Sequence, residues 1–375
     1  MSNIKGKQVP FRADIVGSFL RPEYLKKARE DYKNGIINEY NLIEIEDKAI
    51  VDLISKQKES GLSVITDGEF RRSWWHLDFM WGLNGVKKVE VEYGYRFNDE
   101  TTRAESATLY GKITGENHPF VEHFKFIKSF EDETVIARQT IPAPAQFLAE
   151  LQRADNLIET KKYYKDDEEL ISDIAVAYKT VILDLYNAGC RNVQLDDCTW
   201  GMFCDENYWR NRQGALDSRE EIAKSYVRVN NLAIKDLPED LIITTHVCRG
   251  NYHSTWASTG GYSSIAPILF GEENVSAYYL EFDDDRSGNF EPLKYVNGDK
   301  KVVLGLITSK RAELENKEII ISRIKEASKY IKLDNLFLSP QCGFASTEEG
   351  NTLTEEEQWD KIKLVIDIAN EIWGN

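Results

Sequence analysis

The sequence predicts an α/β fold of the TIM type, a (β/α)8 barrel in which helices follow the strands. Two observations carry this prediction. Short β-branched runs alternate along the chain with longer runs whose apolar residues recur at helical spacing, and eight strand-like runs can be counted. An open doubly wound sheet is the alternative, and it is disfavoured because no Gly-x-Gly-x-x-Gly follows the first strand-like run. We expect residues 1–375 to form a single domain.

The expected core strands are short, apolar and rich in β-branched residues. They are 13–19, 63–69, 134–142, 192–197, 241–247, 275–282, 301–307 and 336–340. The expected helices fill most of the intervals and are 39–60, 145–153, 167–188, 218–235, 318–331 and 354–373.

One segment departs from this alternation. Residues 84–133 contain "VKKVEVEYGYRF" and "SATLYGKITG", which predict a β-hairpin inserted before the third core strand. Insertions of this kind often cover an active site, and surface decoration is the equally weighted alternative.

Composition narrows the class of partner. The formal charge of −16, from 63 acidic and 47 basic residues, argues against nucleic acid or an anionic membrane. We find no apolar window of about 18 residues and no signal-peptide pattern at the N-terminus. Five cysteines do not make a disulfide framework in so long a chain, so a cytoplasmic protein acting on small molecules is expected. A homo-oligomer is left open.

Polar side chains stand at the end of most expected strands, where the chemistry of a TIM barrel is found. They are Ser18, Asp67, Glu69, Asp196, Asp197, Cys198, His246, Cys248, Glu281 and Cys342. Because these strand ends would meet at one face of the barrel, the sequence predicts a converging polar site.

His246 and Cys248 are two positions apart at a strand end, so their side chains should point to the same face. With Glu281 and Cys342 they would offer one nitrogen, two sulfurs and one oxygen, a set that selects Zn2+ over Mg2+ or Ca2+. Such a centre is a poor Lewis acid for making hydroxide but suits a further thiolate that stays nucleophilic and attacks an alkyl donor. Ordinary buried cysteine and histidine residues are the alternative interpretation.

Five stretches, "VGSF", "DGEFRR", "THVCRGN", "YYLEFDD" and "SPQCGF", together resemble the catalytic barrel of cobalamin-independent methionine synthase. The resemblance runs from about residue 11 to the C-terminus. It implies a TIM-type barrel in which His246, Cys248, Glu281 and Cys342 bind zinc. It also implies methyl transfer to the sulfur of homocysteine, which yields methionine.

The same resemblance implies a site for the amino-acid end of homocysteine. The family's binding residues fall on Val16, Ser18, Glu69 and Asp196, and Asp196 is also the expected catalytic residue. Ser18 and nearby backbone would contact the substrate carboxylate, while the two acids would pair with its ammonium group. Without the resemblance, Ser18 would be a turn residue and Glu69 an acid at a helix N-terminus.

Departures from the family's pattern concentrate on the side of the methyl donor. The chain has no room for the second, N-terminal barrel of the folate enzyme, and it resembles the single-barrel members. The motif V-D-E-P-A is replaced by "LDDCTW", and no tryptophan stands in "IPAPAQFL" after the third strand. In "LGLITSKR", Thr308 or Ser309 replaces a histidine thought to protonate the leaving group, and hydroxyls are poor acids. Methyltetrahydrofolate, a corrinoid-bound methyl and a sulfonium all remain candidate donors.

The stretch "EFRRSWWHLDFMW" follows the second strand and offers further donor-side candidates, or else an aromatic cluster that packs the inserted hairpin. The candidates are Arg71, Arg72, Trp74, Trp75 and His76. Residues 253–267 form an expected loop near the metal, and Asp283 or Asp284 could orient a ligand. We expect structural roles for Cys190 and Cys204 and surface positions for His118 and His123.

Three rival functions stay open. One is a zinc-dependent alkyltransferase that acts on another thiol, and a second is a barrel that binds zinc or thiols without catalysis. A hydrolytic zinc enzyme is disfavoured, because two thiolates and a carboxylate leave too little positive charge on the metal to acidify water.

Overall fold

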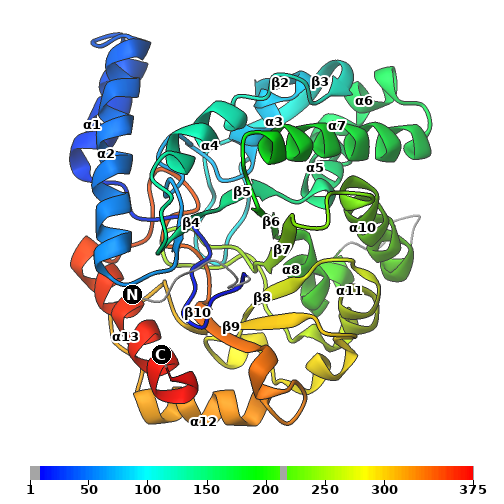
Figure 1. The fold of residues 1–375 in the computed structure, drawn as a ribbon. Coiled ribbons are helices and arrows are strands. Elements are labelled where there is room, and N and C mark those ends of the chain that lie inside the picture. The colour runs from blue at the N-terminus through cyan, green and yellow to red at the C-terminus, as the bar shows by residue number, and fades with distance from the viewer. Residues whose placement is uncertain (1–8, 212–217, 375) are drawn as a thin grey trace.

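A computed structural model describes residues 9–211 and 218–374. Its largest sheet has six parallel strands in the order β10-β9-β8-β7-β6-β5. These strands are β5 (Gln139–Pro142), β6 (Asn192–Asp197), β7 (Ile242–Val247), β8 (Ala277–Glu281), β9 (Lys301–Ile307) and β10 (Leu336–Pro340). Figure 1 shows them in the middle of the molecule with helices around them, as the alternating sequence pattern predicts.

Shorter strand pairings connect the two edge strands of this sheet, β10 and β5. Residue Ala13 bridges to Leu338 of β10, and Ser18 bridges to Gly68 just beyond β1 (Val64–Ile65). Strand β1 pairs in parallel with β4 (Ile136–Ala137), which leads directly into β5. The fold is therefore a TIM-type barrel, part of whose wall consists of isolated bridges.

Two of the eight expected strands differ from the prediction. Residues 13–19 form bridges rather than a regular strand, because the chain turns at Gly17, whose φ of +141° lies outside the strand range. The expected strand 134–142 is divided into β4 and β5. The other expected strands are present, although β1 covers only two residues of the interval 63–69.

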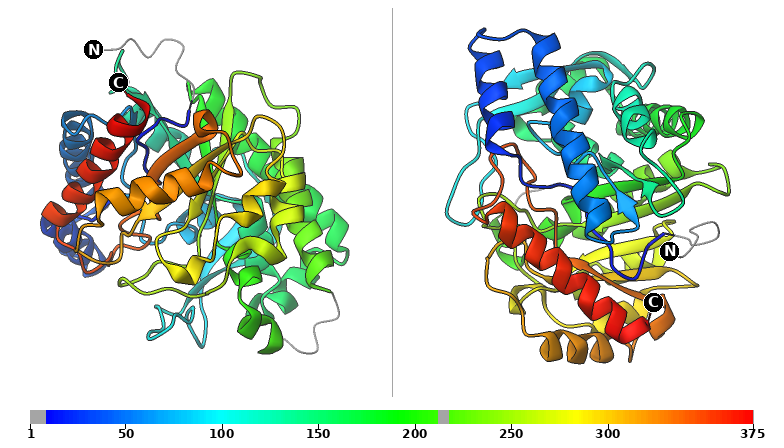
Figure 2. Two further views of the ribbon diagram at one scale, coloured as in Figure 1. Left: turned by 90° about the horizontal axis from the view of Figure 1, so that it is seen from below. Right: turned by 60° about the vertical axis from the view of Figure 1, so that its left-hand side comes forward.

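The six expected helices lie within a few residues of their predicted ends. They are α2 (Glu39–Glu59), α5 (Pro144–Leu151), α7 (Asp167–Asn187), α10 (Arg219–Ile234), α12 (Lys317–Ala327) and α13 (Glu355–Trp373). Further helices are α1 (Glu23–Lys33), α3 (Leu77–Gly82), α4 (Phe120–Lys128), α6 (Ala154–Tyr163), α8 (Thr199–Cys204), α9 (Glu206–Asn211) and α11 (Ala266–Glu272). Figure 2 shows α2 and α13 on the outside of the molecule, where Lys56 pairs with Glu355.

The inserted hairpin is present as predicted. Strands β2 (Asn84–Glu90) and β3 (Glu105–Thr114) pair in an antiparallel register and precede α4. Strand β3 packs on α6 and α7 at the top of Figure 1. The hairpin is thus attached to the barrel by packing as well as by the chain.

A buried ion pair lies inside the barrel. The Arg138 guanidinium contacts the Asp14 carboxylate at 2.8 Å, and both side chains are fully buried. Arg138 also donates to the Tyr279 hydroxyl and to Asn192 Oδ1. Because all these groups are satisfied by one another, the polar interior is compatible with a stable barrel.

The expectation that His118 is a surface residue is wrong. His118 is 1% exposed, and its Nε2 lies 2.9 Å from the Phe79 carbonyl oxygen while its Nδ1 accepts from the Phe120 amide. Burial lowers its pKa to about 4, so the ring is neutral. His123 is half-buried. The sequence prediction assumed that His118, a polar residue in the insertion, is exposed. It can be buried because backbone groups satisfy both of its ring nitrogens.

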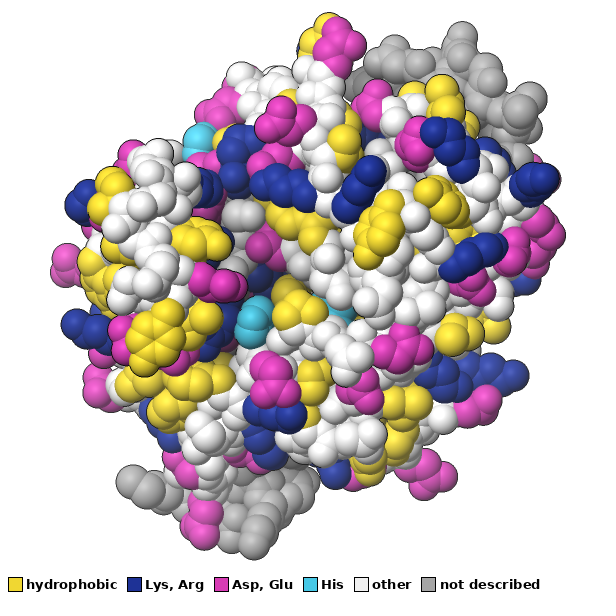
Figure 3. Space-filling model, turned by 90° about the horizontal axis from the view of Figure 1, so that it is seen from above, with side chains coloured by type: hydrophobic (Ala, Val, Ile, Leu, Met, Phe, Trp, Pro, Cys, Tyr) yellow, Lys and Arg dark blue, Asp and Glu magenta, His cyan; other side chains and the backbone are white. Residues whose placement is uncertain are grey.

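In the ranges 9–211 and 218–374, no helix is both long enough and apolar enough to span a bilayer. The face seen in Figure 3 carries acidic and basic side chains interspersed with one another, and it is hollowed between its left-hand part and the rest. This mixture of charges over α1, α2 and α7 does not form a continuous basic surface of the kind that binds nucleic acid.

Candidate metal centre and substrate cavity

The four residues predicted as metal ligands lie together at the carboxyl ends of the strands. His246 belongs to β7 and Cys248 follows it, Glu281 ends β8, and Cys342 comes after β10. One ligand atom from each residue lies within 4.8 Å of all the others, and all four residues are buried. The two sulfur atoms are 3.6 Å apart. The geometry therefore allows a single metal ion to reach all four.

The hydrogen bonds around this group leave metal-binding atoms free. His246 Nδ1 lies 3.3 Å from the carbonyl oxygen of Tyr279, a contact that places the ring proton on Nδ1 and the lone pair on Nε2. His246 Nε2 and Glu281 Oε2 are buried without a hydrogen-bond partner in the described part of the chain. Glu281 Oε1 accepts from the Arg249 amide at 3.0 Å. A divalent ion that accepts imidazole, thiolate and carboxylate ligands fits these orphaned atoms.

The electrostatics of the group also favour a cation. A hydrogen bond shared with Cys198 and burial raise the pKa of the Cys248 thiol well above its usual range. The hydrogen bond with Cys248 and burial do the same to the pKa of Cys342. Without a positive charge these thiols hold their protons, and a bound metal ion would favour the thiolates.

Cys198 is a third thiol at the site, and sequence reasoning did not assign it to the metal group. It follows β6 directly, at the position where Asp197 pairs with Val247 of β7, and so it stands beside Cys248. The register of two parallel strands determines this neighbourhood, and only a correct alignment of β6 with β7 would have revealed it.

The residues predicted to bind the amino-acid end of a substrate line the same cavity as the metal group. They are Val16, Ser18, Glu69 and Asp196. Ser18 packs so closely on Gly343 that a Cβ there would lie 1.9 Å from the Ser18 hydroxyl oxygen. Glu69 has a φ of +63°, a strained conformation for a residue other than glycine. The backbone therefore holds these side chains at a crowded strand-end junction.

Glu69 and Asp196 differ in how their charges are balanced. Arg72 lies 3.1 Å from Glu69 Oε1, and the Thr140 hydroxyl donates to the same oxygen, while Glu69 Oε2 is buried without a described partner. Within residues 9–211 and 218–374, the Asp196 carboxylate accepts one hydrogen bond, from the Gln194 amide at 3.3 Å. Burial first, and then the nearby Glu69 charge, raise the pKa of Asp196 well above its usual range.

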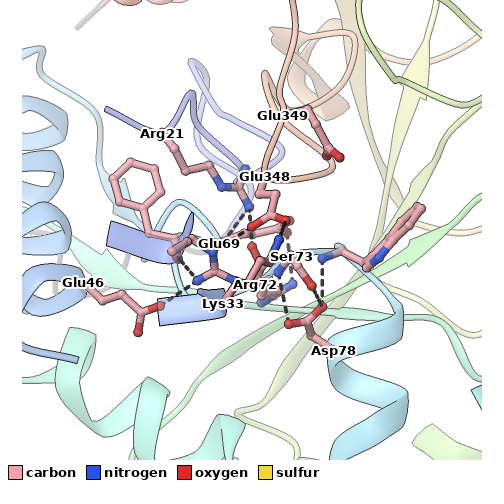
Figure 4. Close-up of polar contacts among 12 residues, drawn as sticks. Arg21, Lys33, Glu46, Glu69, Arg72, Ser73, Asp78, Glu348 and Glu349 are labelled. Atoms are coloured by element: carbon pink, nitrogen blue, oxygen red, sulfur yellow. Dashed lines mark hydrogen bonds and ion pairs between the residues drawn. The ribbon is translucent and has the colours of Figure 1, made fainter. Parts of the chain in front are cut away.

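The turn that carries Glu69 is anchored from two sides (Figure 4). Arg21 donates to the carbonyl oxygens of Glu69 at 2.7 Å and Arg72 at 3.2 Å. Asp78 accepts from the backbone amides of Ser73 and Trp74, at 3.1 and 2.8 Å. Because both ends of the turn are tied by charged groups, the side chains it presents to the cavity have fixed positions.

The cavity has a volume of about 1050 Å3 and extends from the metal group toward the inserted hairpin. Trp74, Trp75 and His76, which the sequence analysis gave as donor-side candidates, line it. Between β2 and β3, residues of the connecting segment, such as Tyr95 and Phe97, line it as well. The insertion therefore forms part of the cavity wall instead of lying only on the surface.

Arg71 and Arg72 are not among the lining residues, which corrects their assignment to the donor side. Arg71 turns outward to Glu46 and Asp47 and stacks over the Phe126 ring. Arg72 lies at 4.5 Å over the Phe120 ring and supports Glu69 from behind. Because this segment is a turn, the side chains of Arg71 and Arg72 point away from the cavity, although the residues that follow them line it.

The remaining sequence predictions also have clear places. Asp283 accepts from Thr308 Oγ1 at 3.0 Å and pairs with Arg286, which lies 3.7 Å from Glu281 Oε2. Cys190 and Cys204 are buried in the hydrophobic core. From the loop 253–267, Trp256, Ala257 and Thr259 line the cavity.

A parallel β/α barrel with a buried thiol-rich group and an acidic pocket at its strand ends is the architecture of a barrel enzyme. The family model of the cobalamin-independent synthase catalytic domain matches residues 11–371, and the chain belongs to this family. The family is one of methyltransferases.

Known proteins agree with this assignment over nearly the whole chain. The chain is 45% identical to the protein YxjH of Bacillus subtilis, over 98% of this chain and 96% of that protein. A crystal structure from Listeria monocytogenes has a TM-score of 0.79 and 41% identity, covering 98% of this chain and 100% of that one. A B12-independent methionine synthase from Shewanella, solved with selenomethionine, has a TM-score of 0.71 at 20% identity, covering 96% and 97% of the two chains, and shows the same fold.

Proposed function

We propose that this protein is a zinc-dependent methyltransferase that transfers a methyl group to the thiol of homocysteine and forms methionine. The observation that carries the proposal is the common cavity. It brings the ligand group of His246, Cys248, Glu281 and Cys342 next to Ser18, Glu69 and Asp196. A thiol group and an amino-acid group of one small molecule could be bound there at the same time.

The proposed role of zinc is to supply a positive charge at which the substrate thiol is bound as a reactive thiolate. The chain's own residues would orient the rest of homocysteine. Glu69 Oε2 and the Asp196 carboxylate are poorly paired in the free protein, and a substrate ammonium group would supply the missing positive charge. We propose that the Ser18 hydroxyl, which lines the cavity, contacts the substrate carboxylate.

The relatives support this proposal at a coarser level. A protein from Saccharolobus islandicus that bears the name methionine synthase is 26% identical to this chain, over 88% of this chain and 86% of that protein. The Shewanella structure holds selenomethionine, an analogue of the product proposed here. Five free cysteines, three of them at the candidate metal centre, support a reducing compartment such as the cytoplasm.

The test is a calorimetric titration of zinc-loaded protein with L-homocysteine in two buffers of different ionisation enthalpy. We expect binding with release of about one proton, because the thiol must lose its proton to bind as a thiolate. Cys342→Ser should abolish this binding. Cys190→Ser is the matched control, because this thiol is buried away from the cavity and donates to the Asn192 carbonyl.

Three outcomes would count against the proposal. Zinc-loaded protein that gives no heat with homocysteine removes homocysteine as the substrate. Wild-type homocysteine affinity in both Glu69→Gln and Asp196→Asn would favour an alkyltransferase for a thiol without an amino-acid end. Binding without repeated turnover to methionine, with methyltetrahydrofolate, methylcobalamin and S-methylmethionine each tried as donor, would favour a barrel that binds zinc and thiols without catalysis.

A further inference from the structure

A buried histidine stands in the wall of the cavity outside the metal group. His76 lies in the turn between β1 and α3, is 3% exposed and lines the cavity. The Trp75 ring lies against it with a centroid distance of 4.5 Å, and the Trp74 ring meets it at 5.9 Å in an edge-to-face arrangement. Two aromatic rings therefore fix the plane of the imidazole.

One nitrogen of this ring is held by a chain of hydrogen bonds that ends in a carboxylate. His76 Nε2 lies 3.1 Å from the Tyr95 hydroxyl oxygen, and this hydroxyl donates to Glu150 Oε2 at 2.9 Å. Arg153 contacts the Glu150 carboxylate at 3.2 and 3.3 Å. Because the Tyr95 hydroxyl donates its single proton to the Glu150 carboxylate, it can only accept a hydrogen bond from His76. The imidazole proton must therefore be on Nε2.

This tautomer leaves a lone pair on Nδ1. His76 Nδ1 is buried and has no hydrogen-bond partner within residues 9–211 and 218–374. Burial, together with the charge of Arg153, lowers the pKa of His76 to about 3, so the ring stays neutral at physiological pH. A buried acceptor without a hydrogen-bond partner destabilises a protein unless a bound molecule donates to it. Because Nδ1 of His76 belongs to a cavity wall, a ligand in the cavity can supply that hydrogen bond.

We propose that His76 Nδ1 accepts a hydrogen bond from the methyl donor and orients it in the cavity, and that Tyr95 is the positioning residue that fixes the required tautomer. The inference rests on the proposed function, in which the thiol side of the cavity is occupied by homocysteine. The matching group on the donor is an N–H or O–H that does not react. The half-buried Trp75 indole, which also lines the cavity, gives that part of the donor an apolar face to lie on.

The same geometry rules out one role for His76. An unprotonated Nδ1 on a neutral ring has no proton to give, so His76 is not the acid that protonates a leaving group. Its contribution is to binding and orientation of the donor. The inserted hairpin takes part through Tyr95, which lies in the segment that joins β2 to β3.

Two substitutions separate the two ring nitrogens. In His76→Gln the amide nitrogen can still reach the Tyr95 hydroxyl, but no acceptor remains at the place of Nδ1. In His76→Asn an amide oxygen can take the place of Nδ1, but the link to Tyr95 is lost. His123→Gln is the control, because His123 is half-buried and not among the lining residues.

The kinetic experiment uses the zinc-loaded full chain and three donor probes, namely 5-methyltetrahydrofolate, S-methylmethionine and methylcobalamin. For the probe that supports methionine formation, we expect His76→Gln to raise the donor KM about tenfold or more, because an unpaired donor group is left in the complex. His76→Asn should raise it less, and His123→Gln should not change it. The homocysteine KM should stay the same in all three variants.

A spectroscopic readout tests the tautomer directly. Long-range 1H–15N spectra of the protein labelled in histidine should show His76 Nδ1 as an unprotonated nitrogen, and Tyr95→Phe should allow the proton to exchange between both nitrogens. Binding of the productive donor should shift the Nδ1 signal toward the hydrogen-bonded range. The ring of His118, which is satisfied by backbone groups, is the internal reference.

The proposal is overturned if Nδ1 carries the proton in the free protein, if none of the three probes shifts its signal, or if His76→Gln keeps a donor KM within twofold of wild type. Its failure is distinguishable from that of the proposed function. Loss of homocysteine binding together with a donor-dependent Nδ1 shift would remove the function and keep the donor subsite. Homocysteine binding with proton release but no Nδ1 shift would keep the function and remove the subsite.

Discussion

Asp196→Asn is expected to make the protein more stable and, at the same time, worse at binding homocysteine. The Asp196 side chain is buried, the residue being 6% exposed, and its carboxylate accepts a hydrogen bond from the Gln194 amide at 3.3 Å. Glu69, whose charge is close enough to raise the Asp196 pKa, already has Arg72 at 3.1 Å. The free protein therefore carries one buried carboxylate that lacks a matching positive charge.

The size of both effects follows from the surroundings of the Asp196 carboxylate in the free protein and in the complex with homocysteine. Replacing a poorly compensated buried charge by a neutral isostere typically stabilises a protein by about 1–3 kcal/mol, which is roughly 1–4 °C in Tm for a chain of this size. In the complex the same carboxylate would pair with the substrate ammonium group. Truncating one partner of a buried charge pair costs at least about 2 kcal/mol, or roughly thirtyfold in Kd.

The pH dependence has a definite sign. Asp196 has a pKa above that of the unfolded chain, so the folded protein binds more protons and wild-type stability falls as the pH rises through the window above the unfolded pKa of about 3.9. Asp196→Asn does not titrate at this position. Its advantage in stability should be near zero at the acidic end of this window and should grow toward neutral pH.

Thermal unfolding of metal-free protein across this pH range and calorimetric titration of zinc-loaded protein with homocysteine measure the two effects. Asp197→Asn is the matched control, because Asp197 lies on the opposite face of β6, where Thr199 and Asn230 satisfy it. It should keep homocysteine affinity and lose stability. The reasoning is refuted if Asp196→Asn is less stable than wild type at neutral pH, or if its homocysteine Kd stays within threefold of wild type.

Three further predictions concern the rest of the barrel. Burial and the Asp197 charge raise the pKa of Glu273 to about 8, so the stability of the wild type should fall between roughly pH 4.5 and 8. In urea unfolding, Glu273→Gln should therefore be more stable than wild type at about pH 9 and equally stable at about pH 4. Arg138→Met should cost about 3–5 kcal/mol in the same assay because it leaves Asp14 buried and unpaired, and adding Asp14→Asn should recover part of this loss; equal stability of the single and double variants would contradict the coupling. Zinc added to metal-free protein should raise the Tm in proportion to ln[Zn2+] at concentrations above the Kd, because the ion binds the folded state. The proposed ligand set would be excluded by a wild-type Tm that does not change with zinc while the Tm of Cys342→Ser does.

The overall fold was accessible from the sequence because buried parallel strands and amphipathic helices have different periods. Helices with a long apolar face, such as α7 and α13, were predicted within one or two residues of their ends. Helix α1 was missed because its sequence is strongly polar and it buries only Leu25 and Ala28, so that few apolar residues mark it as part of the fold. The short strands β1 and β4 could not be bounded, since two paired residues make no periodic pattern.

The predicted ligand residues came from an ordered set of motifs, each tied to the end of a strand. Sequence reasoning failed where the position of a side chain depends on a turn or on the register of two strands. Arg71 and Arg72 were placed on the donor side with their neighbours, but the turn directs them away from the cavity. Cys198 and Cys248 are adjacent through the pairing of β6 with β7, and spacing along the chain does not reveal that.

The walls of the cavity come from two parts of the chain, the barrel framework and the inserted hairpin, and each part can change separately. The candidate ligands and the acidic pocket stand on the barrel framework, at strand ends or on a turn fixed by Arg21 and Asp78. The opposite wall includes Tyr95 from the insertion and Glu150 from α5, which meet only because the hairpin packs back on the barrel. A change in the insertion can therefore alter the proposed donor side of the cavity without moving the candidate ligand group.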